Sequence, residues 1–268
     1  MQRFISYMAE AAMLREAAQQ GFQYEKNAVD ALQPYDVVPK SFVPAGAGSD
    51  VPDLMIKRPG AGQTATGCEL KITAASAGSL VMKWNNGNWS IGNPNETNDE
   101  KLFVIELAKQ VGILNTIKSS WKQEPYKFTS DKKVLSEIQG LDKRAVYSKE
   151  LSRFPEIKGV IPATKIEQYY NKKKTYYVNV GTDGFFLLGS NNPLNLQGVP
   201  SFGKAANAGY RARVQAKGGG NYQFTFEMSF NIPKARRSPY NIAPTVGKSV
   251  KIDFNKMETS LKDLFGIE

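Results

Sequence analysis

The sequence predicts a mixed α/β protein. Residues 2–33 have the apolar spacing of one or two helices broken near Gly21, and residues 99–118 carry apolar side chains around one broad face, as a helix packed on a sheet does. Short apolar runs separated by Gly, Pro and Asn indicate strands. With 268 residues, 41% of them hydrophobic, the chain can bury a large core, as one domain with insertions or as two closely packed domains.

The strands are expected in two groups. The first group follows the N-terminal helix and comprises residues 35–43, 52–57, 67–72 and 79–91. Its last range contains an Asn-Asn-Gly-Asn segment that is typical of a hairpin turn. Residues 120–173 are polar, and we expect them to be mostly helical. The second group of strands comprises residues 175–180, 184–188, 210–214 and 222–230.

The charge balance favours a polyanionic partner. Lys and Arg number 35 and Asp and Glu number 25, which gives a net charge of +10 at pH 7. Lysines and arginines that neutralise phosphates release condensed counterions, so a basic protein gains affinity for nucleic acid.

Histidine and cysteine usage narrows the chemistry. The chain has no histidine, which excludes a Ser-His-Asp triad, a Cys-His protease, His-dependent nuclease sites, HExxH metalloproteases and most zinc sites. The single cysteine, Cys68, cannot form an internal disulfide, and this favours a reducing, cytoplasmic compartment. We expect it to be a small core residue. No run of 18 apolar residues occurs, so we predict no membrane span, and the N-terminus is typical of an amphipathic helix.

Two carboxylates and a lysine occupy two neighbouring predicted strands. Asp53 follows a proline and opens an apolar run, and Glu69-Leu70-Lys71 lies in the next run, beyond a Gly-rich turn. Alternation on a strand sends Glu69 and Lys71 to one face and Leu70 into the core. A tight hairpin would therefore gather an oxygen-rich site suited to Mg²⁺ and phosphate. Asp50 is a less favoured alternative ligand, and a surface hairpin with three salt-bridged side chains is the alternative reading.

This Pro-Asp, then Glu-x-Lys, arrangement resembles the PD-(D/E)XK nuclease superfamily, which includes many restriction endonucleases. The similarity covers residues 20–90. It implies a restriction-endonuclease-like core, in which helices flank a mixed central sheet, together with a β-rich C-terminal region. It also implies a Mg²⁺-dependent endonuclease that cuts double-stranded DNA site-specifically, in a restriction-type or homing-type manner. Members often carry a glutamate on the helix before the Asp, and Glu25 is the matching position.

The resemblance implies a role for each of these residues. Asp53 and Glu69 would hold one or two Mg²⁺ ions, with Mn²⁺ as a substitute and the main-chain carbonyl of Leu70 as a further ligand. Lys71 would orient the attacking water or stabilise the pentacovalent phosphate. Glu25 would help to hold a second ion or an outer-shell water.

We expect residues 1–120 to hold the N-terminal helices and the catalytic core. Residues 121–268 would add a helical insertion and a basic β-rich region that completes the core and the DNA cleft. Alternation places Arg211 and Arg213 on one strand face, for which a solvated surface is the alternative. The candidate DNA contacts are Lys83, Lys172, Lys173, Lys174, Arg211, Arg213, Lys217, Arg236 and Arg237. For Trp84 and Trp89, beside the hairpin tip, core packing is favoured over base stacking.

Two other classes of protein remain as alternatives. One is a non-catalytic DNA-binding protein that keeps the nuclease fold, although the intact Asp, Glu and Lys argue against it. The other is a structure-specific resolvase or an exonuclease, although the long basic C-terminal half is more than a minimal resolvase needs. An RNA-binding module lacks an RNP or KH signature. Two cuts on one duplex favour a homodimer.

Overall fold

The computed structural model describes residues 19–44, 51–60, 62, 64–74, 76–85, 87–217 and 221–267. It is a mixed α/β protein, as predicted, and it has two sheets, each of which combines strands from both predicted groups. The described residues form two compact units. Unit 1 draws on Ala77–Val160 and Gly209–Met228, and unit 2 draws on Ala17–Ser76, Ile161–Ala208 and Ser229–Glu268. Each unit takes segments from both sides of residue 120, so the predicted division there does not coincide with the division between the units.

The sheet of unit 2 is mixed and has the order β1-β2-β6-β7. Its strands are β1 (Leu54–Ile56), β2 (Thr66–Lys71), β6 (Thr175–Val180) and β7 (Gly184–Leu187). β1 and β2 pair antiparallel, with Leu54 opposite Cys68. β2 pairs parallel with β6, with Glu69 opposite Val178, and β7 pairs antiparallel with β6. Strands from both halves of the chain therefore build one sheet.

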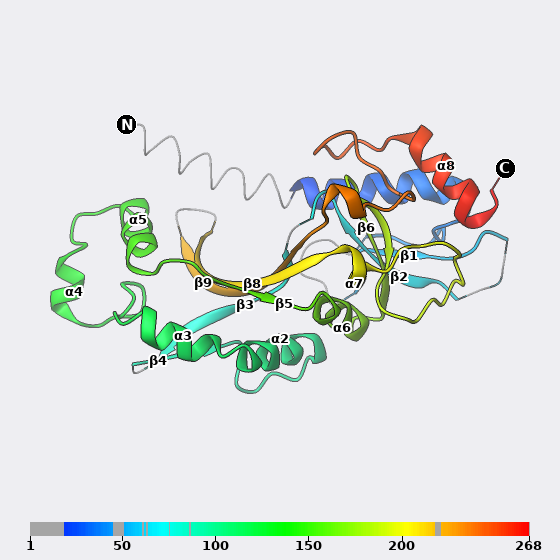
Figure 1. Cartoon of the computed structure of the whole chain (residues 1–268). Coiled ribbons are helices and arrows are strands. Elements are labelled where there is room, and N and C mark those ends of the chain that lie inside the picture. The colour runs from blue at the N-terminus through cyan, green and yellow to red at the C-terminus, as the bar shows by residue number, and fades with distance from the viewer. Residues whose placement is uncertain are drawn as a thin grey trace. The chain divides into compact units, whose positions relative to one another are not determined.

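Helices cover both sides of this sheet (Figure 1). A helix over residues 19–32 and α8 (Phe254–Phe265) lie on one side, and α6 (Thr164–Lys172) lies on the other. The helix over residues 19–32 runs through Gly21 without the predicted break. The core between these two helices and the sheet includes Ala28, Leu32, Leu54, Leu70, Met257 and Leu261. Because α6 leads directly into β6, its C-terminal end lies beside β2, the parallel neighbour of β6.

A buried asparagine fixes the first helix to the sheet. The Asn179 side chain on β6 donates to the Tyr24 hydroxyl at 3.1 Å and to the Ala243 carbonyl at 3.2 Å. Its oxygen accepts from the Ile242 amide at 3.0 Å. Tyr24 also donates to the Ala243 carbonyl at 2.5 Å. These bonds satisfy polar groups in the interior, and they hold the helical turn that carries Glu25 in place.

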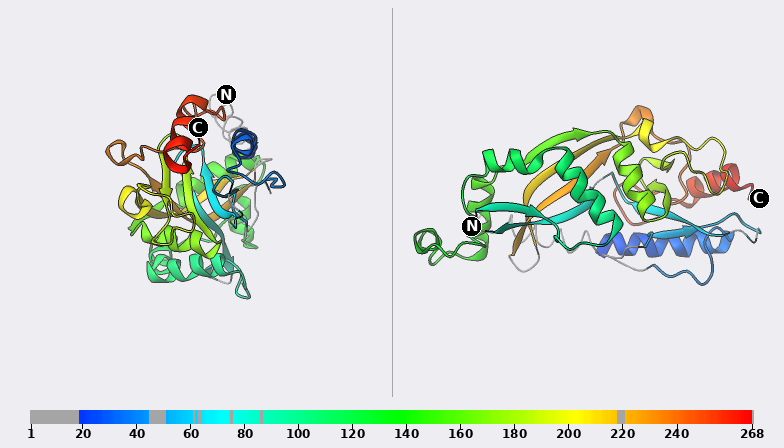
Figure 2. Two further views of the ribbon diagram at one scale, coloured as in Figure 1. Left: turned by 90° about the vertical axis from the view of Figure 1, so that its right-hand side faces the viewer. Right: turned by 90° about the horizontal axis from the view of Figure 1, so that it is seen from below.

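The second sheet lies mostly in unit 1 and is antiparallel, with the order β4-β3-β9-β8-β5. Its strands are β3 (Ser76–Asn85), β4 (Asn88–Ile91), β5 (Ile157–Ile161), β8 (Asn207–Ala216) and β9 (Tyr222–Asn231). The unit also contains α2 (Asp99–Gln110), α3 (Ile113–Ser120), α4 (Lys132–Ser136) and α5 (Lys143–Arg153). Figure 2 shows α2 and α3 lying along one face of the sheet. The predicted hairpin is confirmed, since Trp84 on β3 pairs with Trp89 on β4.

Trp89 is a core residue, as predicted. Its ring centroid lies 4.8 Å from that of Phe224 and 5.3 Å from that of Trp121. Trp84 is half-buried and contacts Trp89 edge to face at 5.4 Å. Aromatic pairs at these distances stabilise the core beyond their buried area.

Several predicted elements differ from the structure. Residues 35–43 form no strand: the chain makes a 3-10 turn, η1 (Gln33–Tyr35), and Asp36 adopts a left-handed conformation with φ 57°. Val37 and Val38, which made this segment look like a strand, are nevertheless fully buried. The helix predicted over 99–118 is two helices, because Gly112 has φ 64°. The largely helical region 120–173 also contains the strand β5.

Three short elements and α8 were not predicted. The short elements are α7 (Phe202–Ala205), η1 and η3 (Lys234–Arg236). The helix α8 begins at the cap Asp253 and ends at Gly266, which has φ 68°. Residues 2–18 and Asp50 lie outside the described residues. Within the described residues no helix has the length and apolar character that a bilayer span requires, in line with the prediction.

Gly67 allows a close approach between β2 and the turn that follows α6. A Cβ atom there would lie 2.6 Å from the Lys174 carbonyl oxygen and 2.6 Å from Cγ of Pro52. We therefore expect Gly67→Ala to lower the free energy of unfolding by about 1–3 kcal/mol in a denaturant titration. Gly62→Ala is the control, because no atom lies within 4 Å of its Cβ position. Equal losses in the two variants would contradict this packing.

Candidate active site

The structure brings Asp53, Glu69 and Lys71 together within unit 2. Asp53 lies just before β1, and its Oδ2 accepts a hydrogen bond from the Leu70 amide at 3.0 Å. The Lys71 ammonium lies 2.5 Å from Oε1 of Glu69 and 4.0 Å from Oδ2 of Asp53. The Leu70 side chain is buried in the core, as alternation requires. The Lys71 ammonium therefore forms ion pairs with both carboxylates.

Glu69 is buried, with 4% of its surface exposed. Its Oε1 pairs with Lys71, but its Oε2 has no hydrogen-bond partner among the described residues. The cation beside Oε2 is Lys173, whose Nζ lies 3.6 Å away. Buried carboxylate oxygens nearly always accept hydrogen bonds, so an unpaired one marks a position where a further donor or a cation can bind.

The lysines keep Glu69 ionised. Burial alone would raise the pKa of Glu69, but Lys71 and then Lys173 outweigh burial, and the pKa is lowered. Burial likewise works to lower the pKa of Lys71, yet Glu69, Tyr170 and Asp53 hold that pKa well above its ordinary value. At neutral pH these side chains are therefore a carboxylate and an ammonium.

The other two carboxyl groups hold their protons more tightly than usual. Burial, followed by the charge of Glu69, raises the pKa of Asp53 to about 6. Burial, followed by the charge of Asp53, raises the pKa of Glu25 to about 7. Glu25 lies on the helix over residues 19–32 and is half-buried. Burial is the larger cause for both groups, and a cation bound nearby would favour their ionised forms.

Sequence reasoning did not identify Tyr170 as part of this site. It lies on α6, is buried, and its hydroxyl has no hydrogen-bond partner among the described residues. Burial and then the charge of Glu69 raise its pKa well above the ordinary value. Lys173, which caps the C-terminal end of α6, follows three residues after Tyr170. That spacing is the sequence signal that could have identified the pair.

The site offers two carboxylates as its core donors. Among the described residues, no group of three or more Cys, Asp and Glu side chains is arranged to hold a metal ion, and the chain has no histidine. Cys68 is no ligand or nucleophile either: burial, and then Asp53 and Glu69, raise the pKa of its thiol well above 9, which agrees with the predicted core role.

Two of the four arginines predicted to contact DNA share a face of β8, and both contact acidic side chains of unit 1. Arg211 and Arg213 both pair with Glu227, the latter at 2.9 Å, and Arg211 lies 3.7 Å from Glu156. Glu227 is 2% exposed, so its charge needs these partners. The two glutamates offset the positive charge of the two arginines, and this favours a structural role for this face.

The remaining basic candidates are exposed, apart from Lys173, which lies beside Glu69. Arg237 pairs with Asp183 at 2.8 Å, and Arg236 donates to the Lys204 carbonyl and to the Asn207 side chain, all within unit 2. The other exposed candidates are Lys83 and Lys217 in unit 1 and Lys172 and Lys174 in unit 2.

Because the pKa of Glu25 is raised, the stability of the folded protein should depend on pH. A glutamate with a folded-state pKa of about 7 binds its proton more tightly in the folded protein than in the unfolded chain. Its contribution to stability therefore falls as the pH rises from about 4 to about 7. In EDTA at about pH 8 we expect Glu25→Gln to unfold at a higher temperature than the wild type. At about pH 5 this difference should largely vanish.

Asp30→Asn is the matched control for Glu25→Gln, because Asp30 is an exposed carboxylate on the same helix. If the melting temperature rises equally at both pH values, or equally in both variants, ionised Glu25 does not destabilise the folded protein.

No protein-family model matches the chain, and neither a curated protein nor a solved structure is significantly similar to it. The function therefore has to be argued from the site itself.

Proposed function

We propose that this chain is a Mg²⁺-dependent endonuclease that hydrolyses phosphodiester bonds of double-stranded DNA site-specifically. One observation carries the proposal: Glu69 is buried, one of its oxygens accepts no hydrogen bond from the described residues, and Asp53 and a protonated Lys71 lie beside it. Carboxylate oxygens paired with an ammonium suit a metal ion and a phosphate. The net charge of +10 supports a polyanionic substrate.

The donor set fits a hard divalent cation. Asp53, Glu69 and the Leu70 carbonyl would supply oxygen ligands, and Mg²⁺ prefers oxygen ligands and retains several waters. The raised pKa values of Asp53 and Glu25 support this fit, because both carboxyl groups ionise more readily when a cation is near. When bound, the ion would acidify a water and offset charge on the scissile phosphate. Mn²⁺ would serve as a substitute.

Three other side chains would assist the reaction. Lys71, which stays protonated at neutral pH, would donate to a phosphate oxygen and orient the attacking water. Lys173 would offset the charge of Glu69 and contact the phosphate from the other side. Glu25 would be ionised beside the bound ion and would orient an outer water.

The direct test is incubation of the purified protein with supercoiled plasmid, with Mg²⁺ or with EDTA. Linear or nicked product only with Mg²⁺ supports the proposal. Tight binding without cleavage would instead identify a non-catalytic DNA-binding protein. Cutting confined to junctions or to ends would identify a resolvase or an exonuclease. Discrete fragments with paired cuts would support a site-specific homodimer.

Replacing either carboxylate should separate binding from cleavage. Asp53→Asn and Glu69→Gln each remove a metal-binding charge, so we expect both to abolish Mg²⁺-dependent cleavage. Binding to the same DNA should stay equal or become tighter, because a group that repels phosphate has gone. Asp30→Asn serves as the control. Cleavage by either site variant at close to the wild-type rate would refute the assignment of that ligand.

The lysine should be irreplaceable. Lys71→Ala removes a preorganised donor to the developing charge and should slow cleavage by roughly a hundredfold or more. Lys71→Arg should not restore the rate, since a guanidinium is larger and differs in geometry from a compact ammonium. Single-turnover rates at saturating enzyme give the comparison. Full activity of the arginine variant would show that only a positive charge is needed.

A further inference from the structure

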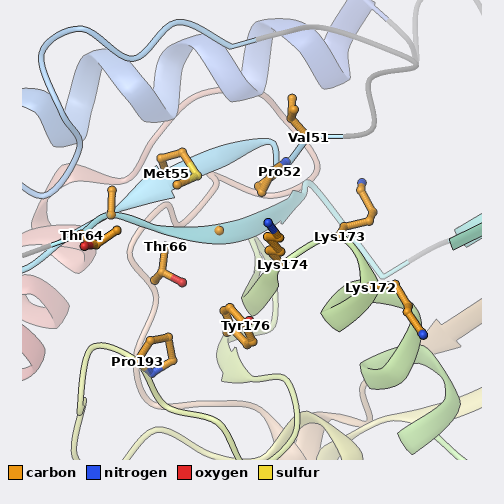
Figure 3. Close-up of a pocket in the computed structure, with 12 residues that line it drawn as sticks. Val51, Pro52, Met55, Thr64, Thr66, Lys172, Lys173, Lys174, Tyr176 and Pro193 are labelled. Atoms are coloured by element: carbon orange, nitrogen blue, oxygen red, sulfur yellow. The ribbon is translucent and has the colours of Figure 1, made fainter. Parts of the chain in front are cut away.

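A cavity of about 550 Å³ lies in unit 2 beside the candidate active site (Figure 3). Its walls come from β1, β2, β6 and the end of α6. Cavities of this size hold small ligands, so the cavity can take one nucleotide and excludes a base-paired helix.

The cavity wall has two kinds of surface. Met55, Tyr176 and Pro193 supply apolar and aromatic surface. Lys172 and Lys174, whose side chains are exposed, supply positive charge at the α6 end. A ligand that fits both has a flat, largely apolar body and an attached anion. A nucleotide has this chemistry, because every base has a face that stacks on an aromatic ring.

The cavity and the active site share structure. Lys173 lines the cavity and also lies 3.6 Å from Glu69. Pro52 lines it and directly precedes Asp53, and Gly67 lines it two residues before Glu69 on the same strand face. A ligand in the cavity would therefore lie next to a phosphate held at the carboxylates.

We propose that this cavity holds one nucleotide that has left the base stack, next to the bond to be cut. Its base lies against Tyr176, and its phosphate lies at the α6 end of the cavity, beside Lys174. This inference rests on the proposed nuclease function and makes its substrate more specific: the DNA that is cut presents an unpaired or flipped nucleotide. Extrusion of such a nucleotide costs least where it has no pairing partner.

The test compares two duplexes of the same length, one fully paired and one with a single unpaired thymidine. Binding of the full-length protein is measured in EDTA, where cleavage cannot contribute. We expect the wild type to bind the duplex with the unpaired nucleotide about tenfold more tightly, as one base stacked on an aromatic ring provides. Equal affinity for the two duplexes overturns the proposal without any variant.

Variants identify the cavity as the source of the preference. Tyr176→Ala should lose the preference, and Tyr176→Phe should keep it, because the stacking ring remains. Lys172→Ala with Lys174→Ala should weaken binding to the duplex with the unpaired nucleotide more than the charge-matched control, Lys248→Ala with Lys256→Ala, does. Those two control lysines are exposed and do not line the cavity. A preference that survives in Tyr176→Ala, or that is lost equally in Tyr176→Phe, overturns the assignment.

Failure of this inference can be told apart from failure of the proposed function. If plasmid is cut with Mg²⁺ and the two duplexes bind equally, only the cavity assignment fails. If no DNA is cut but the preference depends on Tyr176, the cavity assignment holds and the nuclease proposal fails.

Discussion

The buried charge of Glu69 is the constraint on which the rest of unit 2 depends. An ionised carboxylate in the interior is strongly destabilising unless cations accompany it. Lys71 comes from the same strand face, but Lys173 comes from the end of α6, far along the chain. The second cation reaches Glu69 only because β6 pairs parallel with β2 and α6 leads directly into β6. The segment that leads from α6 into β6 therefore brings the second positive charge to Glu69.

Several features of the site oppose folding. Asp53 and Glu25 hold protons more tightly than usual, and within the part of the chain that the structure describes, the buried Tyr170 hydroxyl and one Glu69 oxygen make no hydrogen bond. Such features cost folding free energy and persist where the surrounding structure is strong enough to impose them. Here the Asn179 network and the core between the helix over residues 19–32 and α8 supply that strength.

Local patterns predicted the parts of the site that depend on local geometry. Alternation placed Glu69 and Lys71 together, and the Pro-Asp pair before an apolar run placed Asp53 beside them. The proximity of Lys173 to Glu69 depends on which strands pair across the chain, and no short-range pattern encodes that pairing. The contact of Arg213 with Glu227 joins the consecutive strands β8 and β9, and this local pairing was not predicted. The strand predicted over residues 35–43 is absent, because Val37 and Val38 are buried without forming a strand. The helix α8 was not predicted, although the sequence contains a typical residue at each of its ends, the N-cap Asp253 and the C-cap Gly266.

We propose that Asp53 and Glu69 form a divalent-cation site, and electron paramagnetic resonance measures Mn²⁺ binding to it. We expect the wild type to bind Mn²⁺, Mg²⁺ to displace it, and Glu69→Gln to weaken binding greatly while Asp30→Asn leaves it unchanged. The free Mn²⁺ signal reports binding without relying on cleavage. Wild-type protein that binds no Mn²⁺, or a Glu69→Gln variant that binds it as tightly as the wild type, would rule out this metal site.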